Sequence, residues 1–267
     1  MNGLQRNVAI KIVRSQEALG LLDDDSCGVS YKDVLRSMRM EMEVMESMGK
    51  HPNIVELLSQ DKVDHVMVME KGSTDLYKMV RKMNAEKGAP EHIMRAWAQG
   101  ICSGVSFMHD TGYVHQDLKS SNILVFADFT VKVCDFGLAR KLPETTMLVD
   151  RELCTLWYRA PELLMCESMY SHKIDEWSVG CILLEMVIGS PPFRGKPECI
   201  CQCPQVTHRN FNSDQLARIF LMVGSPSEKL MSRIPCQVHI RGMLSDFLSF
   251  PFLLQQIWCL FLLYCID

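Results

Sequence analysis

The chain has 267 residues, 12 cysteines and a formal net charge of -4. Its length allows a sizeable core, built as one large domain or as two packed lobes. A slightly acidic chain lacks the basic excess with which proteins bind phosphate backbones, so we expect no nucleic acid partner. The cysteines lack the spacing of a disulfide framework and no signal peptide is recognised, which indicates a reducing, intracellular setting in the cytoplasm, the nucleus or both.

Strand patterns dominate the first seventy residues. The β-branched run at residues 8–13 predicts a strand, and the acidic stretch with Gly and Ser at residues 23–30 predicts a loop. In residues 34–48, four methionines at nearly helical spacing alternate with charged side chains, which predicts a helix with a core-facing stripe. Short apolar runs at residues 54–58 and 63–70 predict two further strands.

Helical spacing takes over after Asp75. Apolar residues recur every three or four positions in residues 93–108, and segments 176–188 and 215–223 also suit helices. Two short apolar runs, residues 123–125 and 131–134, predict a β-hairpin between the helical parts. The pattern predicts a small β-rich part followed by a larger helical part.

Several polar residues suited to holding phosphate and metal occur close together. The segment His-Gln-Asp-Leu-Lys-Ser-Ser-Asn places the carboxylate of Asp117, the ammonium of Lys119 and the amide of Asn122 on one short loop. The predicted hairpin would then carry Asp135, the first residue of Asp-Phe-Gly, back beside Asn122. Phosphoryl transfer needs this kind of alignment and charge neutralisation more than covalent help.

Each residue taken alone has a simpler structural explanation. His115 alone suits a packed core position, Lys11 and Glu41 alone suit a solvent-facing surface, and Asp175 can cap a helix. It is the order of the motifs along the chain that argues against an accidental arrangement.

Together the motifs resemble those of eukaryotic protein kinases. The Val-Ala-Ile-Lys run that ends at Lys11 is similar to the kinase strand whose lysine contacts ATP phosphates, and Glu41 matches the helix carboxylate that orients this lysine. Ala-Pro-Glu at residues 160–162 resembles the end of an activation segment, and residues 175–180 resemble the start of the helix that supports the catalytic loop. The resemblance implies an α+β, two-lobed protein kinase-like fold, with a small β-rich N-lobe and a larger helical C-lobe.

The resemblance also assigns roles. Asp117 would accept the proton of the substrate hydroxyl, Lys119 would stabilise the transferring phosphate, and Thr155 would brace both. Asn122 and Asp135 would hold Mg²⁺. Residues implied to bind ATP are Lys11, Glu41, Met69 at the back wall of the pocket, Glu70 near the hinge, Asp75 at the ribose, Asn122 and Asp135.

The substrate class and the group within the family follow from two segments. Asp-Leu-Lys-Ser-Ser-Asn at residues 117–122 is similar to serine/threonine kinases, which implies protein substrates with Ser or Thr acceptors. Residues 154–162 and 213–216 resemble the cyclin-dependent and mitogen-activated kinase group, most of all the cyclin-dependent kinases. No cyclin-binding helix sequence is recognised between Lys11 and Glu41, so a cyclin-like regulatory subunit is left open.

The sequence also departs from the family. No Gly-x-Gly occurs, so we expect a truncated N-lobe that lacks its first strands and glycine-rich loop, with weaker phosphate binding. Gln116 stands where most members have the arginine that receives an activation-segment phosphate, and Asp150 stands at the usual phosphothreonine position. Asp150 is then either a partial phosphate mimic paired with Arg140 or a solvated loop carboxylate, and Thr145 and Thr146 remain candidate phosphorylation sites.

The expected organisation is a partial N-lobe at residues 1–70, a C-lobe at 71–230 with an insertion at about 196–212, and a divergent hydrophobic tail at 231–267. The insertion holds three alternating cysteines, Cys199, Cys201 and Cys203, whose spacing does not suit a zinc site. Residues 247–266 carry no charge, but a proline and two glutamines favour a buried or disordered tail over a membrane anchor. Glu162 lacks the arginine partner that relatives have, which predicts a less stable helical lobe.

Two functions therefore stand open. The retained catalytic residues indicate an active serine/threonine kinase with reduced activity. The missing glycine loop and the altered C-terminal end indicate a non-catalytic, pseudokinase-type interaction or scaffold protein.

Overall fold

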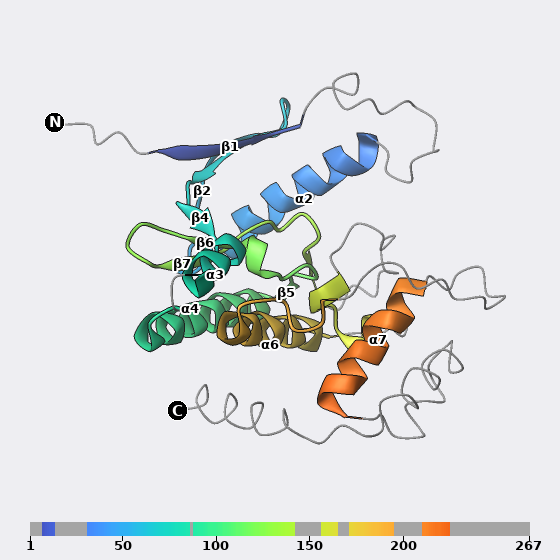
Figure 1. Cartoon of the computed structure of the whole chain (residues 1–267). Coiled ribbons are helices and arrows are strands. Elements are labelled where there is room, and N and C mark those ends of the chain that lie inside the picture. Colours follow the sequence, from blue (N-terminus) through green and yellow to red (C-terminus); the bar gives the residue numbers. More distant parts are fainter. Residues whose placement is uncertain are drawn as a thin grey trace. The chain divides into compact units, whose positions relative to one another are not determined.

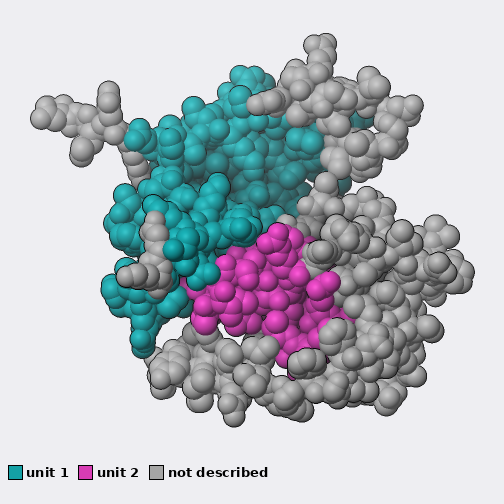
Figure 2. Space-filling view, in the orientation of Figure 1, with its two compact units in different colours: residues 1–144 teal, residues 145–267 magenta. Residues whose placement is uncertain are grey.

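The structure is a computed structural model, and it describes residues 7–13, 31–85, 88–141, 156–164, 171–194 and 210–224 (Figure 1). The chain divides into two compact units, residues 1–144 and 145–267 (Figure 2). The lobe boundary at residue 70 and the other predicted domain limits remain predictions. Mixed α and β structure, with a sheet near the N-terminus and helices toward the C-terminus, agrees with the expected fold class.

An antiparallel sheet opens unit 1. Strands β1 (Val8–Ile12), β2 (Leu57–Asp61) and β3 (Val66–Glu70) pair in the order β1-β3-β2. Helix α2 (Tyr31–Met48) confirms the predicted helix. Its methionine stripe is buried, as the spacing predicted: Met38, Met42, Met45 and Met48.

Strand β2 has the predicted length but begins three positions later than the run at residues 54–58, and β3 begins three positions later than the run at residues 63–70. A turn explains the later start of β3. The Asp61 carboxylate accepts hydrogen bonds from the backbone N–H groups of Val63 and Asp64, at 2.8 and 3.0 Å. Such an Asx turn bends the chain, and β3 begins only at Val66. Ile54 lies outside β2 and forms an isolated parallel bridge with Val133.

The remaining strands of unit 1 are short. Strands β4 (Thr74–Asp75), β6 (Ile123–Val125) and β7 (Val131–Val133) form a sheet in the order β4-β6-β7, which confirms the predicted hairpin. A two-stranded ribbon joins β5 (Tyr113–Val114) to β8 (Arg140–Lys141).

Two helices and one turn complete unit 1: α3 (Leu76–Ala85), α4 (Glu91–Asp110) and the 3₁₀ turn η1 (Ser120–Asn122). The pattern at residues 93–108 predicted α4, but α3 was not predicted. Its signals were present, because Asp75 precedes it as a side-chain cap that accepts the N–H of Lys78 at 2.9 Å. Leu76 and Val80, four positions apart, form its buried face.

The loop between α2 and β2 lies against α4. Asn53 Nδ2 donates to the Val131 carbonyl at 2.9 Å. A Cβ atom at Gly104 would lie 2.6 Å from the Asn53 backbone oxygen, and one at Gly100 would lie 2.7 Å from the Asn53 side chain. The two glycines therefore allow the loop to approach the helix more closely than any larger residue would.

Unit 2 is helical in its described part. It contains η3 (Leu156–Tyr158), α5 (Pro161–Leu164), α6 (Lys173–Ile188) and α7 (Asn210–Val223). Helix α6 is followed by Gly189, whose φ of 79° is the left-handed conformation usual after a helix.

Polar contacts inside unit 2 join η3 to α6. The Tyr158 hydroxyl donates to Glu185 at 2.7 Å, and the Ser178 hydroxyl donates to the Tyr158 carbonyl at 2.8 Å. Asp175 lies in the first turn of α6 and is buried, whereas the N-cap position belongs to His172. The simpler explanation of Asp175 as the helix cap is therefore wrong.

Several predictions fall on residues that the structure does not describe. These are the loop at 23–30, Thr145, Thr146, Asp150, Thr155, the three cysteines of the insertion and the tail at 231–267. Among the described residues, none of the helices combines the length and apolar character needed to cross a membrane. Glu162 has no ion pair with another described residue, so its lack of an arginine partner stays a prediction.

Candidate functional site

A three-residue ion cluster joins β1, α2 and the segment after β7. The Lys11 ammonium lies 2.5 Å from Glu41 Oε2 and 3.1 Å from Asp135 Oδ1. The other oxygen of Glu41 accepts the backbone N–H of Phe136 at 3.3 Å. One buried carboxylate thus ties the lysine of the sheet to the Asp-Phe-Gly segment, although the residues are far apart in sequence.

The members of this cluster differ in burial, and burial together with the neighbouring charges shifts the pKa of each member. The Glu41 side chain is 2 % exposed, whereas those of Lys11 and Asp135 are 43 % and 45 % exposed. Burial raises the pKa of Glu41 despite the opposing effect of Lys11. For Lys11, burial works to lower the pKa, but the two carboxylates outweigh it and the pKa is raised. For Asp135, burial works to raise the pKa, yet the Lys11 ammonium holds it below the ordinary range.

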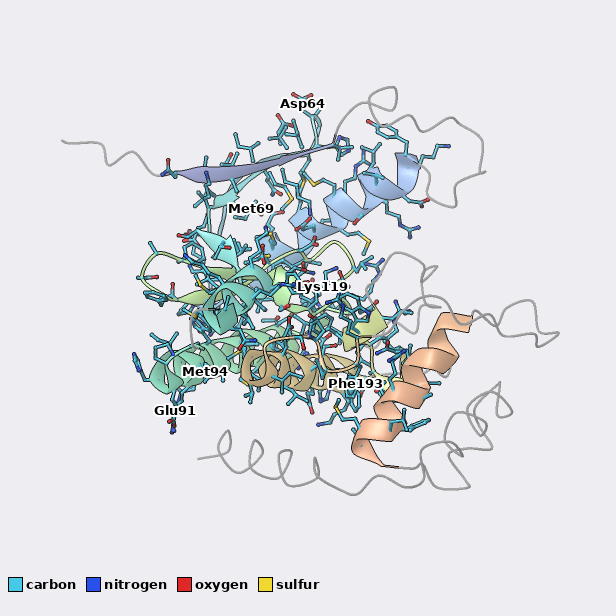
Figure 3. The ribbon with its side chains drawn as sticks, in the orientation of Figure 1. Asp64, Met69, Glu91, Met94, Lys119 and Phe193 are labelled. Carbon is cyan, nitrogen blue, oxygen red and sulfur yellow. The ribbon has the colours of Figure 1, made fainter. Side chains whose placement is uncertain are left out.

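A second cluster lies on the loop before β6. Lys119 Nζ lies 2.6 Å from Asp117 Oδ2, and both side chains are largely buried. Asn122 Nδ2 donates to the Asp117 backbone carbonyl at 2.9 Å and to its carboxylate at 3.3 Å. Figure 3 labels Lys119 on this loop. The three predicted side chains therefore meet, and Lys119 and Asn122 both bond the same carboxylate oxygen of Asp117.

The hairpin brings the metal-binding candidates together, as predicted. The Cys134 N–H donates to the Asn122 backbone carbonyl at 2.9 Å, and the Cys134 thiol contacts the same oxygen at 3.3 Å. Asp135 follows directly in the chain. Burial raises the pKa of the Cys134 thiol to about 12, so this group is a neutral packing element at physiological pH.

His115 is fully buried and connects the two loops. Its Nε2 atom lies 3.1 Å from the Cys134 carbonyl oxygen, and its Nδ1 atom accepts the backbone N–H of Asp117 at 3.3 Å. Since a carbonyl can only accept, the proton of the neutral ring is on Nε2. Its ring also packs on Phe136, with centroids 5.3 Å apart. The packed-core explanation of His115 is correct, and the same contacts position Asp117.

Two residues of the loops have left-handed backbone conformations. Gln116 and Asp135 both have φ of 69°, which is uncommon for residues other than glycine and accessible to Asp. Local strain of this kind persists where surrounding contacts over-determine the backbone. Here the hydrogen bonds of Asp117 and Phe136, the following residues, provide such contacts.

The donor atoms on these loops suit a hard divalent cation. Asn122 uses its amide nitrogen for the contacts with Asp117, so its oxygen is the end that remains for a metal. Asp135 binds Lys11 through Oδ1 and retains a second carboxylate oxygen. One amide oxygen and one carboxylate oxygen are the kinds of ligand that Mg²⁺ prefers.

Three other predicted site residues occupy structural positions. Met69 is partly buried on β3 and pairs with Ala9 in the sheet (Figure 3). The Glu70 carboxylate lies 2.6 Å from Lys132 Nζ and accepts the N–H of Glu56 at 3.2 Å. Asp75 caps α3 and also lies 2.7 Å from the Lys78 ammonium. For all three residues, contact with a nucleotide remains a prediction.

Contacts that sequence reasoning missed join distant segments. The bond from the Phe136 N–H to Glu41 and that from Ser37 to the Gly137 carbonyl, at 3.1 Å, tie α2 to the Asp-Phe-Gly segment. The Lys132–Glu70 pair was also missed. No local pattern reveals such pairs, because the partners are 62 or more positions apart.

Comparison with known proteins identifies relatives. The family described as "Protein kinase domain" matches residues 2–238. The chain is 39% identical over 172 residues to "Mitogen-activated protein kinase 15" of Xenopus laevis, covering 61% of this chain and 29% of that protein. It is 35% identical over 220 residues to "Serine/threonine-protein kinase ppk23" of Schizosaccharomyces pombe, covering 79% and 49%. It is 34% identical over 206 residues to "Cyclin-dependent kinase G-2" of Oryza sativa subsp. indica, covering 76% and 26%. The chain spans less than half the length of each of these relatives.

Proposed function

Because this chain belongs to the protein kinase family, we propose that it transfers the γ-phosphoryl group of ATP to serine or threonine hydroxyls of proteins. The relatives confirm its resemblance to cyclin-dependent and mitogen-activated kinases. One observation carries the proposed reaction: the Lys11–Glu41–Asp135 ion cluster occurs in the same unit as the Asp117–Lys119–Asn122 cluster.

ATP with Mg²⁺ would supply the transferable phosphoryl group and neutralise part of its charge. Lys11 would offer its ammonium to the nucleotide phosphates, and Glu41 would keep that ammonium in place from the buried side. Asn122 and Asp135 would hold the metal through the amide and carboxylate oxygens that their protein contacts leave available.

Asp117 is the group proposed to receive the proton of the acceptor hydroxyl. Its carboxylate is oriented by Lys119 at 2.6 Å and by Asn122 at 3.3 Å, which limits its rotation. Lys119 also brings positive charge to the place where the phosphoryl group would pass. Positioning of this kind is the main contribution that a protein makes to phosphoryl transfer.

A non-catalytic interaction protein is the second candidate. The 267 residues contain no Gly-x-Gly segment, so the backbone donors that such a segment directs at phosphates have no counterpart in this sequence. This observation favours weak nucleotide binding and low turnover. It leaves open an interaction role in which the kinase fold serves as a scaffold.

Regulation and location are proposed by analogy with the relatives. One relative is named as a cyclin-dependent kinase, so a cyclin-like subunit is the first regulatory partner to test. Gln116, in place of the usual arginine, supports activity that does not depend on activation-segment phosphorylation. An intracellular location, in the cytoplasm or nucleus, suits a chain whose cysteines lack the spacing of a disulfide framework.

The decisive experiment measures magnesium-dependent transfer of labelled phosphate from ATP to a Ser/Thr-containing protein, with and without candidate cyclin-like subunits. Asp117→Asn is the matched control, and thermal unfolding verifies that it folds. We expect incorporation on serine or threonine that falls by about 100-fold or more in Asp117→Asn, as is typical for the loss of an acid-base group. Equal incorporation by both proteins would exclude the proposed role of Asp117, and none in either would favour the scaffold.

A further inference from the structure

Unit 1 contains a cavity of about 520 Å³ that lies apart from the two ion clusters. It is lined by the C-terminal end of α2, by the loop that follows, by β2 and by Lys132 of β7. None of the side chains assigned above to nucleotide, metal or hydroxyl lines it. Its volume lies in the range of sites that hold small molecules.

The charged groups around this cavity are already neutralised by the protein. Lys50 pairs with Glu56, and Lys132 pairs with Glu70 at 2.6 Å. Glu46 is 2.8 Å from a lysine outside the cavity, Lys62. A charged ligand would lose its hydration without gaining an unpaired counter-charge, so the cavity favours an uncharged one.

One half of the lining residues are apolar. Met45, Ile54 and Val55 are buried, and Leu57 and Leu58 of β2 are partly exposed beside them. Flat aromatic molecules bury much surface at little cost in conformational freedom, which suits a wall of this kind.

One polar atom at the cavity lacks a partner. Gln60 lines the cavity, and its side chain also hydrogen-bonds Glu46. The Gln60 Oε1 atom is buried and has no hydrogen-bond partner. The residue as a whole is only partly buried, and a ligand in the cavity would reach this oxygen only if the Gln60 side chain rotated. An N–H group on a ligand is what an unpaired buried acceptor requires.

We propose that this cavity is a binding site for a small, uncharged aromatic molecule that carries an N–H donor. The aromatic ring contacts the apolar wall, and the N–H group donates to Gln60 Oε1. Because Met45 and Glu46 lie on the same helix as Glu41, the ligand also contacts the element that holds Lys11. The proposal does not depend on phosphoryl transfer, since it concerns binding alone.

Indole and 1-methylindole are suitable probes, because they share ring and neutrality and differ in the N–H donor. Their dissociation constants for the full chain are measured by ligand-observed saturation-transfer NMR. We expect indole to bind about tenfold more tightly than 1-methylindole, the upper range for one hydrogen bond. Equal affinities, or no binding of either probe at millimolar concentration, would overturn the proposal.

Three variants locate the site. Gln60→Met should weaken indole binding by about tenfold and leave 1-methylindole within about twofold. Ser59→Trp places a large ring on an exposed lining residue and should weaken both probes by about tenfold or more. The matched control is Val63→Trp, since Val63 is 83% exposed and does not line the cavity, and it should bind both probes as the parent does.

Urea unfolding verifies that each variant folds. Undiminished binding of both probes by Ser59→Trp would show that they bind elsewhere and reject the site, whatever the behaviour of Gln60→Met.

Discussion

Replacing Glu41 by glutamine should reduce activity without reducing stability. The change keeps the shape of the side chain, and the remaining amide oxygen can still accept the Phe136 N–H now bonded at 3.3 Å. It removes the charged hydrogen bond to Lys11 at 2.5 Å. A hydrogen bond to a charged group contributes about 1.5–3 kcal/mol, so we expect nucleotide binding or phosphoryl transfer to fall by about 10- to 100-fold.

The stability effect follows from the unequal burial of the two partners. Burial raises the pKa of Glu41, so the folded chain holds its proton more tightly than the unfolded chain does. Ionising this carboxyl therefore opposes folding at pH values above its folded pKa, and the cost is relieved as the pH falls through that value. Lys11 is 43 % exposed and retains Asp135 at 3.1 Å, so the variant leaves no stranded charge. We expect a change in unfolding free energy of about 1 kcal/mol or less, in contrast to the 3–5 kcal/mol typical of breaking a fully buried pair.

The measurement combines urea unfolding at pH 7 with labelled-phosphate transfer, or with MgADP titration if turnover is low. Glu43→Gln is the matched control, because Glu43 is exposed on the same helix, and it should change neither quantity. A loss of 3 kcal/mol or more in Glu41→Gln would refute the reasoning, since about that much is expected only where the remaining charge is stranded. Unchanged activity would refute the positioning of Lys11 by Glu41.

Three further predictions concern stability and reactivity. For Asp135, whose folded pKa is depressed below its ordinary value near 3.8, the stabilisation is present above that value and lost as pH falls through the folded pKa. The parent should therefore have a higher free energy of unfolding in urea than Asp135→Asn, by an amount that is constant from about pH 5 to 7 and shrinks below about pH 3.8. If this difference in unfolding free energy were the same at every pH, the prediction would be contradicted. Gly104→Ala should destabilise the chain by about 1–3 kcal/mol in the same assay, because the new Cβ would lie 2.6 Å from the Asn53 oxygen, and an unchanged midpoint would show that the loop moves freely. The Cys134 thiol, whose pKa is raised to about 12, should resist iodoacetamide at pH 8 in the folded protein and react once urea unfolds it, as followed by mass spectrometry. Rapid labelling of Cys134 in the folded chain would contradict the raised pKa.

The secondary structure was largely accessible from local patterns. The methionine spacing of α2 and the apolar runs of β6 and β7 depend only on neighbours a few positions away, and the structure confirms them. The boundaries of β2 and β3 were less accessible, because the Asp61 side chain turns the backbone against the β-branched pattern around Val63. Helix α3 was missed although its cap and its buried face were both visible in the sequence.

The candidate site, too, was predictable only in part. Asp117, Lys119 and Asn122 lie within six consecutive positions, so their meeting followed from one short loop and its resemblance to kinases. The structural contacts of Glu70 and Asp75 were not predicted, and their contact with a nucleotide stays a prediction. Glu70 pairs with Lys132 from a strand 62 positions away, and Asp75 caps a helix.

By itself, the sequence determined which chemical groups are present and their order, and this was enough to recognise the kinase family. Only the tertiary structure decided that Lys11 meets Asp135 as well as Glu41, that Glu41 is buried whereas Asp135 is half exposed, and that His115 bonds both loops. The reason is physical: distances and burial depend on segments that are remote in sequence, and these set the pKa of each group. The residue types specify the chemistry that is available, and the packing around them sets the charge of each group and what it can reach.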